Sequence, residues 1–233
     1  MSHKKIHRFM MSSPIPPGEV FEITDERIVH QVGRVLKMEP GEVLAVFNDG
    51  TGDTIGRIES IDKTSITVEK LNDTAPIVSK RTVIAAVAIP KGDTFELITQ
   101  KLTELGVSTI VPLITSRTIK QSVRLDRLQT ISDEAVEQCG GNSRVTITEP
   151  VSIQECLAQF PFPSIAFEPG AAKEIDSSSD TVVMYVGPEG GWSEDDMELL
   201  KDVTWVSLGE RILRTETAAI VGVHSILQSI LNT

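Results

Sequence analysis

The sequence lacks any apolar run near the roughly 20 residues that a membrane-spanning helix needs. It also lacks an apolar segment behind the basic residues at its start, so we expect no signal peptide. The only two cysteines, Cys139 and Cys156, form no CxxC pair and no metal-ligand cluster with the four histidines. These absences predict a cytoplasmic protein with two reduced thiols, no metal and no membrane contact.

The usual phosphate-binding motifs are missing as well. Neither GxGxxG nor GxxxxGK followed by Ser or Thr occurs, although the segment "GPEGG" at 187–191 joins an apolar run to a helix start. That helix opens with three carboxylates, Glu194, Asp195 and Asp196, which complement the helix dipole and take the place of a bound anion. The loop is therefore expected either to bind a neutral or cationic ligand through its backbone or to be a plain turn.

Basic charge is scarce. The formal net charge is −11, with 9 Lys and Arg against 12 Asp and Glu in residues 1–75 (−3) and 13 against 21 in residues 76–233 (−8). A chain this acidic is unsuited to non-specific nucleic-acid binding. A local basic patch for one defined nucleic-acid target remains open, because the charges in the first ten residues are all basic.

Two halves of the chain have different patterns. Residues 20–71 contain short strand-like runs, hairpin-type residues at 48–53, and one helical pattern at 25–38. We interpret residues 1–72 as a small β-barrel domain, with a linker at about 72–80. Residues 73–233 form the second predicted domain.

The second half alternates strands and helices. Strands are expected in "VIAAVAI" at 83–89, in "STIVPLI" at 108–114, and at 164–169, 181–187 and 204–209. Capping boxes predict helices that start at Asp93 and Ser193, and a further helix is expected at 125–139. This alternation predicts an open α/β parallel sheet with right-handed crossovers and a ligand site at the carboxyl ends of the strands.

The segment "LGERILRTETA" at 208–218 is the second candidate for that site. It leaves a strand through Gly209 and displays Arg211, Arg214 and Glu216 before a helix with small residues on one side. The simpler interpretation of this segment is that its arginines are solvated on the surface and its apolar residues pack in the core. Two arginines and a glutamate between a strand end and a helix start favour a functional loop.

Together, "GPEGGWSEDDMELL" and "SLGERILRTETAAI" resemble the paired C-terminal motifs of the 16S ribosomal RNA (uracil-N3) methyltransferases, members of the knotted SPOUT superfamily. "PKGDTFELITQKLTELGVSTIVPLIT", "EAVEQCGGNSR", "HRFM" and "VGRVLKMEPGEVLAVFNDG" agree, so the resemblance covers essentially the whole chain. It implies a deep trefoil knot, a PUA-like N-terminal RNA-binding domain, S-adenosylmethionine as cofactor, and a homodimer with the active site at the subunit interface. The implied substrate is 16S ribosomal RNA in the small ribosomal subunit, methylated at uridine N3.

The resemblance also assigns residues. The cofactor site would be lined by Leu113, Thr115, Gly187, Glu189, Gly190, Gly191, Leu208, Gly209, Ile212 and Leu213. RNA would be contacted by Arg8, Arg34, Lys37, Arg144 and Arg211. The family usually has Arg where Lys37 stands, and it commonly has an Arg where this chain has Gly141, with Arg144 following later.

A mechanism follows as a hypothesis. The N3 proton must leave before uracil is a nucleophile, so a base and a stabiliser of the resulting anion are needed. Arg214 is the expected stabiliser, and Glu189 or Glu216 the expected base. Glu216 has the alternative role of orienting Arg214 or capping the last helix.

Three other functions stay open on the sequence. One is a SPOUT methyltransferase that acts on a ribose 2′-hydroxyl or a tRNA base. Another is a non-catalytic RNA-binding protein of this fold. A metabolic α/β enzyme is disfavoured because the phosphate motifs and a nucleophile elbow are absent.

Overall fold

The computed structural model describes residues 6–77, 79–119, 121–171, 175 and 179–229. The chain divides into two compact units. The first consists of residues 1–78 and 136–144, and the second of residues 79–135 and 145–233. The single boundary predicted after residue 72 did not anticipate that residues 136–144 group with the first unit, and the role of residues 1–72 as a separate RNA-binding domain stays a prediction.

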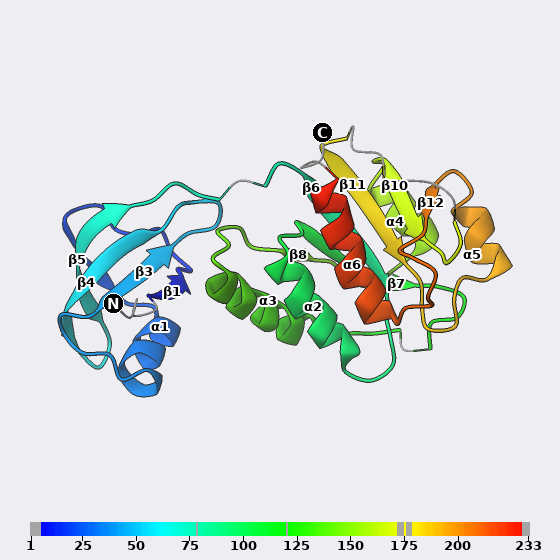
Figure 1. Cartoon of the computed structure of the whole chain (residues 1–233). Coiled ribbons are helices and arrows are strands. Elements are labelled where there is room, and N and C mark those ends of the chain that lie inside the picture. The colour runs from blue at the N-terminus through cyan, green and yellow to red at the C-terminus, as the bar shows by residue number, and fades with distance from the viewer. Residues whose placement is uncertain (1–5, 78, 120, 172–174, 176–178, 230–233) are drawn as a thin grey trace. The chain divides into compact units, whose positions relative to one another are not determined.

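The first unit contains a five-stranded sheet in the order β1-β3-β4-β5-β2 (Figure 1). Strands β3, β4, β5 and β2 pair antiparallel, whereas β1 pairs parallel with β3. Gly50, with a φ of 74°, lies in the connection between β3 and β4, where a left-handed residue was expected. The strand bounds are β1 His7–Met10, β2 Val20–Ile23, β3 Val43–Phe47, β4 Thr54–Ile61 and β5 Ile66–Asp73.

The predicted helix at 25–38 is two short helical segments. The α-helix α1, Glu26–His30, starts at Asp25, whose carboxylate accepts hydrogen bonds from the backbone N–H groups of Arg27 and Ile28. It continues into a π-helical segment, η1 Gln31–Val35. The helical spacing of Ile28, Val32, Val35 and Leu36 predicted one apolar face, and this is confirmed in part. Ile28 and Val32 are fully buried and Leu36 packs against the same core, whereas Val35 is 60% exposed.

The second unit is an α/β fold built on a parallel sheet in the order β12-β10-β11-β6-β7-β8, with β9 pairing β7 beside β8. All its strand pairs are parallel, which confirms the predicted sheet type. The expected strands are all present. Their bounds are β6 Thr82–Ala88, β7 Thr109–Ile114, β8 Thr146–Ile147, β9 Val151–Ser152, β10 Ser164–Phe167, β11 Thr181–Val186 and β12 Thr204–Val206.

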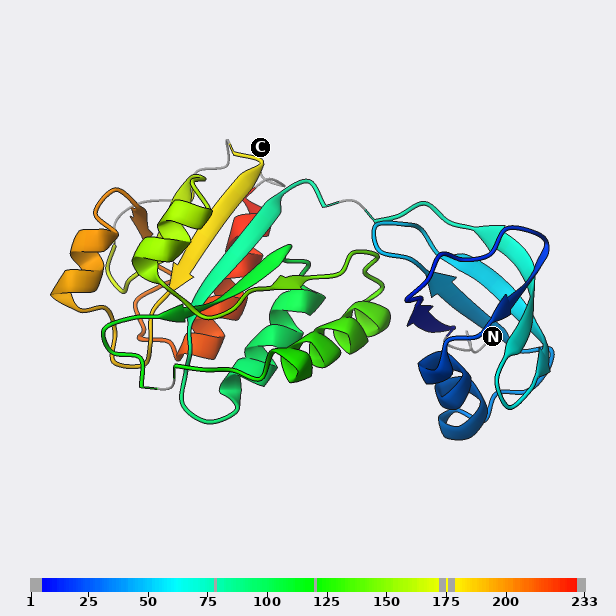
Figure 2. The ribbon, with the colours of Figure 1, turned by 180° about the vertical axis from the view of Figure 1, so that it is seen from behind.

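Helices cover both faces of this sheet. In the central strand β6, Val83, Ala85 and Val87 pack with α2, α3 and α6, whereas Ile84 and Ala86 pack with α4 and the segment around α5. Figures 1 and 2 show α6 and α2 on one side of the sheet and α4 on the other. The bounds are α2 Thr94–Glu104, α3 Leu125–Cys139, α4 Ile153–Gln159, α5 Glu194–Leu199 and α6 Thr215–Gln228.

The two predicted capping boxes have different outcomes. Ser193 and Asp196 form the expected reciprocal hydrogen bonds at the start of α5. The box at Asp93 is wrong, because Asp93 makes no side-chain cap. The Glu96 carboxylate instead forms ion pairs with Arg124 and Arg127 near the start of α3, which compete for the carboxylate that the box requires.

Within the described part of the chain, no helix is long and apolar enough to cross a membrane. Among the same residues, no group of three or more His, Cys, Asp or Glu side chains is placed to hold a metal ion.

Candidate functional site

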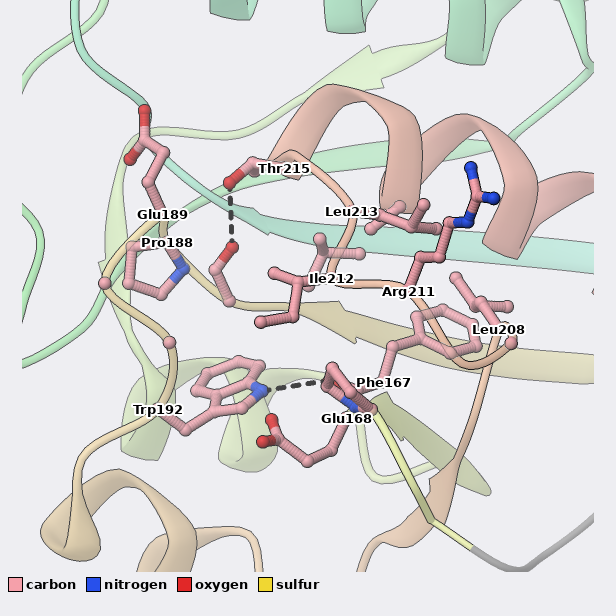
Figure 3. A pocket seen from close by; sticks show the side chains of 17 residues that line it. Phe167, Glu168, Pro188, Glu189, Trp192, Leu208, Arg211, Ile212, Leu213 and Thr215 are labelled. Carbon is pink, nitrogen blue, oxygen red and sulfur yellow. Dashed lines mark hydrogen bonds between the residues drawn. The ribbon is translucent and has the colours of Figure 1, made fainter.

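A cavity of about 280 Å³ lies where β10, β11 and β12 end (Figure 3). These three strands are neighbours in the sheet, so the loops that follow them meet at its carboxyl edge. The cavity is lined by residues of all three loops and by the start of α6. The two segments singled out in the sequence therefore form one site, as their positions after parallel strands predicted.

The glycine loop 187–191 is shaped by Trp192. A Cβ on Gly187 would lie 2.9 Å from Cε2 of the Trp192 ring, so only glycine fits there without a shift. The ring is buried, and its Nε1–H donates to the carbonyl of Phe167 at the end of β10, 3.2 Å away. Gly191 has a φ of 70° and closes the turn by donating its N–H to the carbonyl of Pro188.

The second loop joins the first through Thr215. The Thr215 hydroxyl, buried at the first turn of α6, donates to the Gly187 carbonyl 3.1 Å away, as drawn in Figure 3. Between β12 and α6 the chain turns at Gly209, whose φ is 125°. It then presents Ile212 with 88% of its surface exposed, although Ile212 lines the cavity. Together with Leu208 and Leu213, Ile212 makes this part of the cavity lining apolar.

The start of α5, next to the glycine loop, is capped by the Asp196 carboxylate. Burial alone would raise the pKa of the Asp196 carboxyl, but hydrogen bonds from the Ser193 and Ser116 backbone and side chains outweigh it and hold the pKa below its usual value. The carboxylate is only 2% exposed. A phosphate at the start of α5 would meet this buried negative charge and its two neighbouring carboxylates.

Most of the residues predicted for a cofactor site line this cavity. They are Gly187, Glu189, Gly190, Gly191, Leu208, Gly209, Ile212 and Leu213, together with Arg211, which was assigned to RNA. Leu113 and Thr115 do not line it. Leu113 is fully buried within β7, and the Thr115 hydroxyl and N–H are hydrogen-bonded to the hydroxyl of Thr118.

The three predicted catalytic residues occupy different places. The Glu189 carboxylate points away from Ile212 and Trp192 in Figure 3 and accepts a long hydrogen bond, 3.4 Å, from the backbone N–H of Lys91. Arg214 lies outside the cavity lining, with its side chain 85% exposed. Its guanidinium is 3.9 Å from the Glu216 carboxylate, which suits the orienting role considered for Glu216.

Arg8 is held inside the first unit. Its guanidinium pairs with both carboxylate oxygens of Asp53 at 2.8 Å and stacks 4.6 Å above the centre of the Phe47 ring. It also donates to the carbonyls of Val136 and Gly141. These contacts already engage the guanidinium N–H groups that a phosphate would use. We therefore assign Arg8 a structural role, and its contact with RNA stays a prediction.

The other predicted RNA contacts lie on the surface. Arg34 and Lys37 are exposed near the end of η1, and Lys37 has an unusual φ of 51°. Arg144 is exposed too, and its backbone N–H donates to Asp49, 2.8 Å away. None of these placements tests RNA binding, and the assignments stay predictions.

Sequence reasoning missed several residues of the cavity. The end of β10 contributes Phe167, Glu168 and Pro169, and the loop after β11 contributes Trp192. "SIAFEP" was recognised as a strand, and the rule that ligands lie beyond the carboxyl ends of parallel strands pointed to its last residues as well. The neighbouring position of β10 and β11 was the missing information, because strand order depends on the tertiary fold.

Comparison with known proteins defines the class first. The sequence model of an RNA methyltransferase domain matches residues 78–227, which includes the whole cavity. A Ribosomal RNA small subunit methyltransferase E of Rickettsia conorii is 31% identical over 232 residues, covering 95% of both chains. The protein of the same name from Bacillus subtilis is 29% identical, covering 91% of both chains.

Solved structures agree. A Ribosomal RNA small subunit methyltransferase E from Neisseria gonorrhoeae bound to S-adenosyl methionine superposes with a TM-score of 0.87 at 28% identity, covering 97% of this chain and 98% of that one. A Legionella pneumophila protein in complex with the cofactor SAM has a TM-score of 0.85 at 30% identity, covering 97% and 98%. The chain belongs to the ribosomal RNA small subunit methyltransferase E family, as the paired motifs indicated.

Proposed function

We propose that this protein transfers a methyl group from S-adenosylmethionine to N3 of a uridine in 16S ribosomal RNA of the small subunit. The observation that carries the proposal is that the two motif loops line the same cavity and are joined to each other by the Thr215–Gly187 hydrogen bond. The family relationship and the cofactor-bound relatives support it.

The cavity suits this cofactor. Its volume of about 280 Å³ is near the lower end of ligand pockets, roughly 300–1,000 Å³. Its wall combines apolar side chains, such as Leu208 and Leu213, with backbone groups of glycines that carry no side chain to block approach. The buried Asp196 disfavours a phosphate ligand, and S-adenosylmethionine has no phosphate.

The cofactor would supply an electrophilic methyl group on a positively charged sulfur. The two loops would hold it beside the target base and exclude water, and such alignment contributes several kcal/mol to a transfer reaction. Arg214, free of the cavity wall and only loosely paired, would stabilise negative charge on the deprotonated uracil. Glu216 or Glu189 would accept the N3 proton. The uracil must be extruded from any base stacking to reach these carboxylates.

Finer structural features belong to the same proposal. We propose that the C-terminal segment is threaded into a trefoil knot and that the first unit is a PUA-like RNA-binding domain. A homodimer would complete the active site, which fits an Ile212 that is almost fully exposed and an Arg214 that points to solvent. The expected location is the cytoplasm.

The decisive test uses ribosomal small subunits from a strain that lacks this gene. Incubation with the protein and S-adenosylmethionine should produce N3-methyluridine, identified by mass spectrometry of the nucleosides. Arg214→Ala should lose methyl transfer and keep most of its cofactor binding in calorimetry, because Arg214 does not line the cavity. Arg127→Ala, which removes an exposed Arg that pairs with Glu96, is the matched control and should remain active.

Other results would redirect the assignment. A 2′-O-methylated nucleoside would indicate ribose methylation. Cofactor binding without any methylated RNA would favour a binding protein. Full activity of Arg214→Ala would contradict the role given to Arg214.

A further inference from the structure

The loop that follows β7, residues 115–118, is hydrogen-bonded to the glycine loop and to the helix that follows it. The backbone N–H and the hydroxyl of Ser116 donate to Oδ1 of Asp196 in α5, at 3.1 and 2.9 Å. Nη1 of Arg117 donates to the carbonyl of Gly190 in the glycine loop, 2.5 Å away. This loop does not line the cavity, so the contacts belong to the support of the cofactor loop and not to its wall.

Asp196 accepts hydrogen bonds from both the loop after β7 and the start of α5. Its Oδ1 accepts the two hydrogen bonds from Ser116, and its Oδ2 accepts the backbone N–H of Ser193 at 3.1 Å. A carboxylate that is only 2% exposed is tolerated because these donors replace the water it has lost. The same side chain therefore starts α5 and holds the loop after β7 against it.

Arg117 supports the glycine loop at Gly190. A Cβ placed on Gly190 would lie 3.5 Å from Cδ of Arg117, so the stem of the arginine packs along the loop while its guanidinium holds the carbonyl. The arginine itself stands on a preformed turn. The Thr118 hydroxyl accepts the Thr115 N–H at 3.0 Å, and the Thr118 N–H donates to the Thr115 carbonyl at 3.1 Å.

We propose that Ser116, Arg117 and Asp196 are positioning residues that hold the glycine loop 187–191 in its binding shape and thereby set the affinity for the cofactor. The physical reason is that glycines lose more conformational freedom on ordering than any other residue. A loop already held by neighbouring groups does not lose that freedom again when the ligand binds, so its affinity is higher. The inference rests on the proposed use of this cavity for S-adenosylmethionine.

The test compares Arg117→Ala and Arg117→Lys by calorimetry with S-adenosylmethionine and by steady-state kinetics on ribosomal subunits. Losing one charge-assisted hydrogen bond should raise Kd and the KM for the cofactor about tenfold in Arg117→Ala. Arg117→Lys, which keeps a cation able to reach the Gly190 carbonyl, should recover most of this loss. The KM for ribosomal subunits should not change. Arg124→Ala removes another exposed Arg of the same unit and is the control that should bind normally.

The contact between Ser116 and Asp196 is tested by two variants, Asp196→Asn and the milder Ser116→Ala. Ser116→Ala removes one of the two donors to Asp196 and keeps α5 capped, so it can be measured even if Asp196→Asn does not fold. Both should weaken cofactor binding more than they change kcat. A raised KM for ribosomal subunits with unchanged cofactor affinity in Arg117→Ala would overturn the proposal and make Arg117 an RNA contact. Unchanged values for both substrates would also overturn it.

Hydrogen exchange separates this proposal from the proposed function. The backbone N–H groups of Gly187, Glu189, Gly190 and Gly191 should exchange faster in Arg117→Ala than in the unaltered protein, whether or not a cofactor binds. If the unaltered protein binds no S-adenosylmethionine, the proposed function fails while this measurement still decides the positioning role. Equal exchange rates would refute it.

Discussion

The three glycines of the 187–191 loop should respond differently to the same substitution, alanine. At Gly187 the new Cβ would lie 2.9 Å from Cε2 and 3.2 Å from Nε1 of Trp192. At Gly190 it would meet only the stem of Arg117, at 3.5 Å. At Gly191 it has room, with Nη1 of Arg117 nearest at 3.9 Å, but the φ of 70° strains any residue with a side chain.

The expected magnitudes follow from these contacts. The Trp192 ring is buried and packs edge-on against Trp205 with 6.0 Å between centroids, so it has little room to retreat. Gly187→Ala should therefore cost roughly 1–3 kcal/mol of unfolding free energy for overpacking. Losing the Trp192 hydrogen bond to Phe167 would add about 1 kcal/mol. Gly191→Ala should cost about 1–2 kcal/mol from the left-handed backbone.

Gly190→Ala is the matched control in the same loop. Its backbone φ is outside the left-handed range and its new Cβ makes an ordinary contact. By restricting the unfolded chain it should leave the stability unchanged or raise it by about 0.4–1 kcal/mol.

Urea unfolding followed by tryptophan fluorescence measures these differences. Both tryptophans, Trp192 and Trp205, belong to the second unit, so their emission reports on the unit that holds the loop. The midpoint should fall for Gly187→Ala and Gly191→Ala at constant slope. Calorimetry should show that Gly187→Ala also weakens cofactor binding. An unaltered midpoint for Gly187→Ala, or an equal loss in Gly190→Ala, would refute the reasoning.

Three further outcomes are expected. Gly222→Ala in α6 should lower the unfolding free energy measured in urea. The new Cβ would lie 2.4 Å from Cε2 of Phe167, and overpacking costs about 1–3 kcal/mol, which outweighs the preference of about 1 kcal/mol for alanine over glycine in a helix. Adding Phe167→Leu should restore the stability. The pKa of Asp196 is lowered on folding, so its carboxylate contributes to the unfolding free energy. This contribution is complete above about pH 4 and is lost as the pH falls through the pKa of the folded protein. The unfolding free energies of Asp196→Asn and the unaltered protein should therefore converge in acid. Arg8→Lys should lose about 1.5–3 kcal/mol in calorimetric unfolding, because lysine cannot bridge both oxygens of Asp53 and the carbonyls; an unchanged transition would contradict the structural role.

Local patterns in the sequence predicted the elements of the second unit well. The continuous apolar run of β6 reflects a parallel strand that is buried on both faces. The 15-residue pattern of α3 recurs with the period of a helix. The Ser193 capping box succeeded because both partners lie within one helical turn. The box at Asp93 failed because Glu96 has arginine partners about 30 positions later in the sequence.

The sequence by itself determined most strands and helices of the second unit, though not α4, β8 or β9. It also determined that the glycine loop is unsuited to phosphate and, through the paired motifs, the family to which the chain belongs. Only the tertiary structure decided that β10 lies between β11 and β12, which brings Phe167 and Trp192 into the same cavity. It also decided that Arg8 is held internally while Arg214 is exposed. The physical reason is that strand order and long-range ion pairs depend on residues far apart in the chain, and no local period records them.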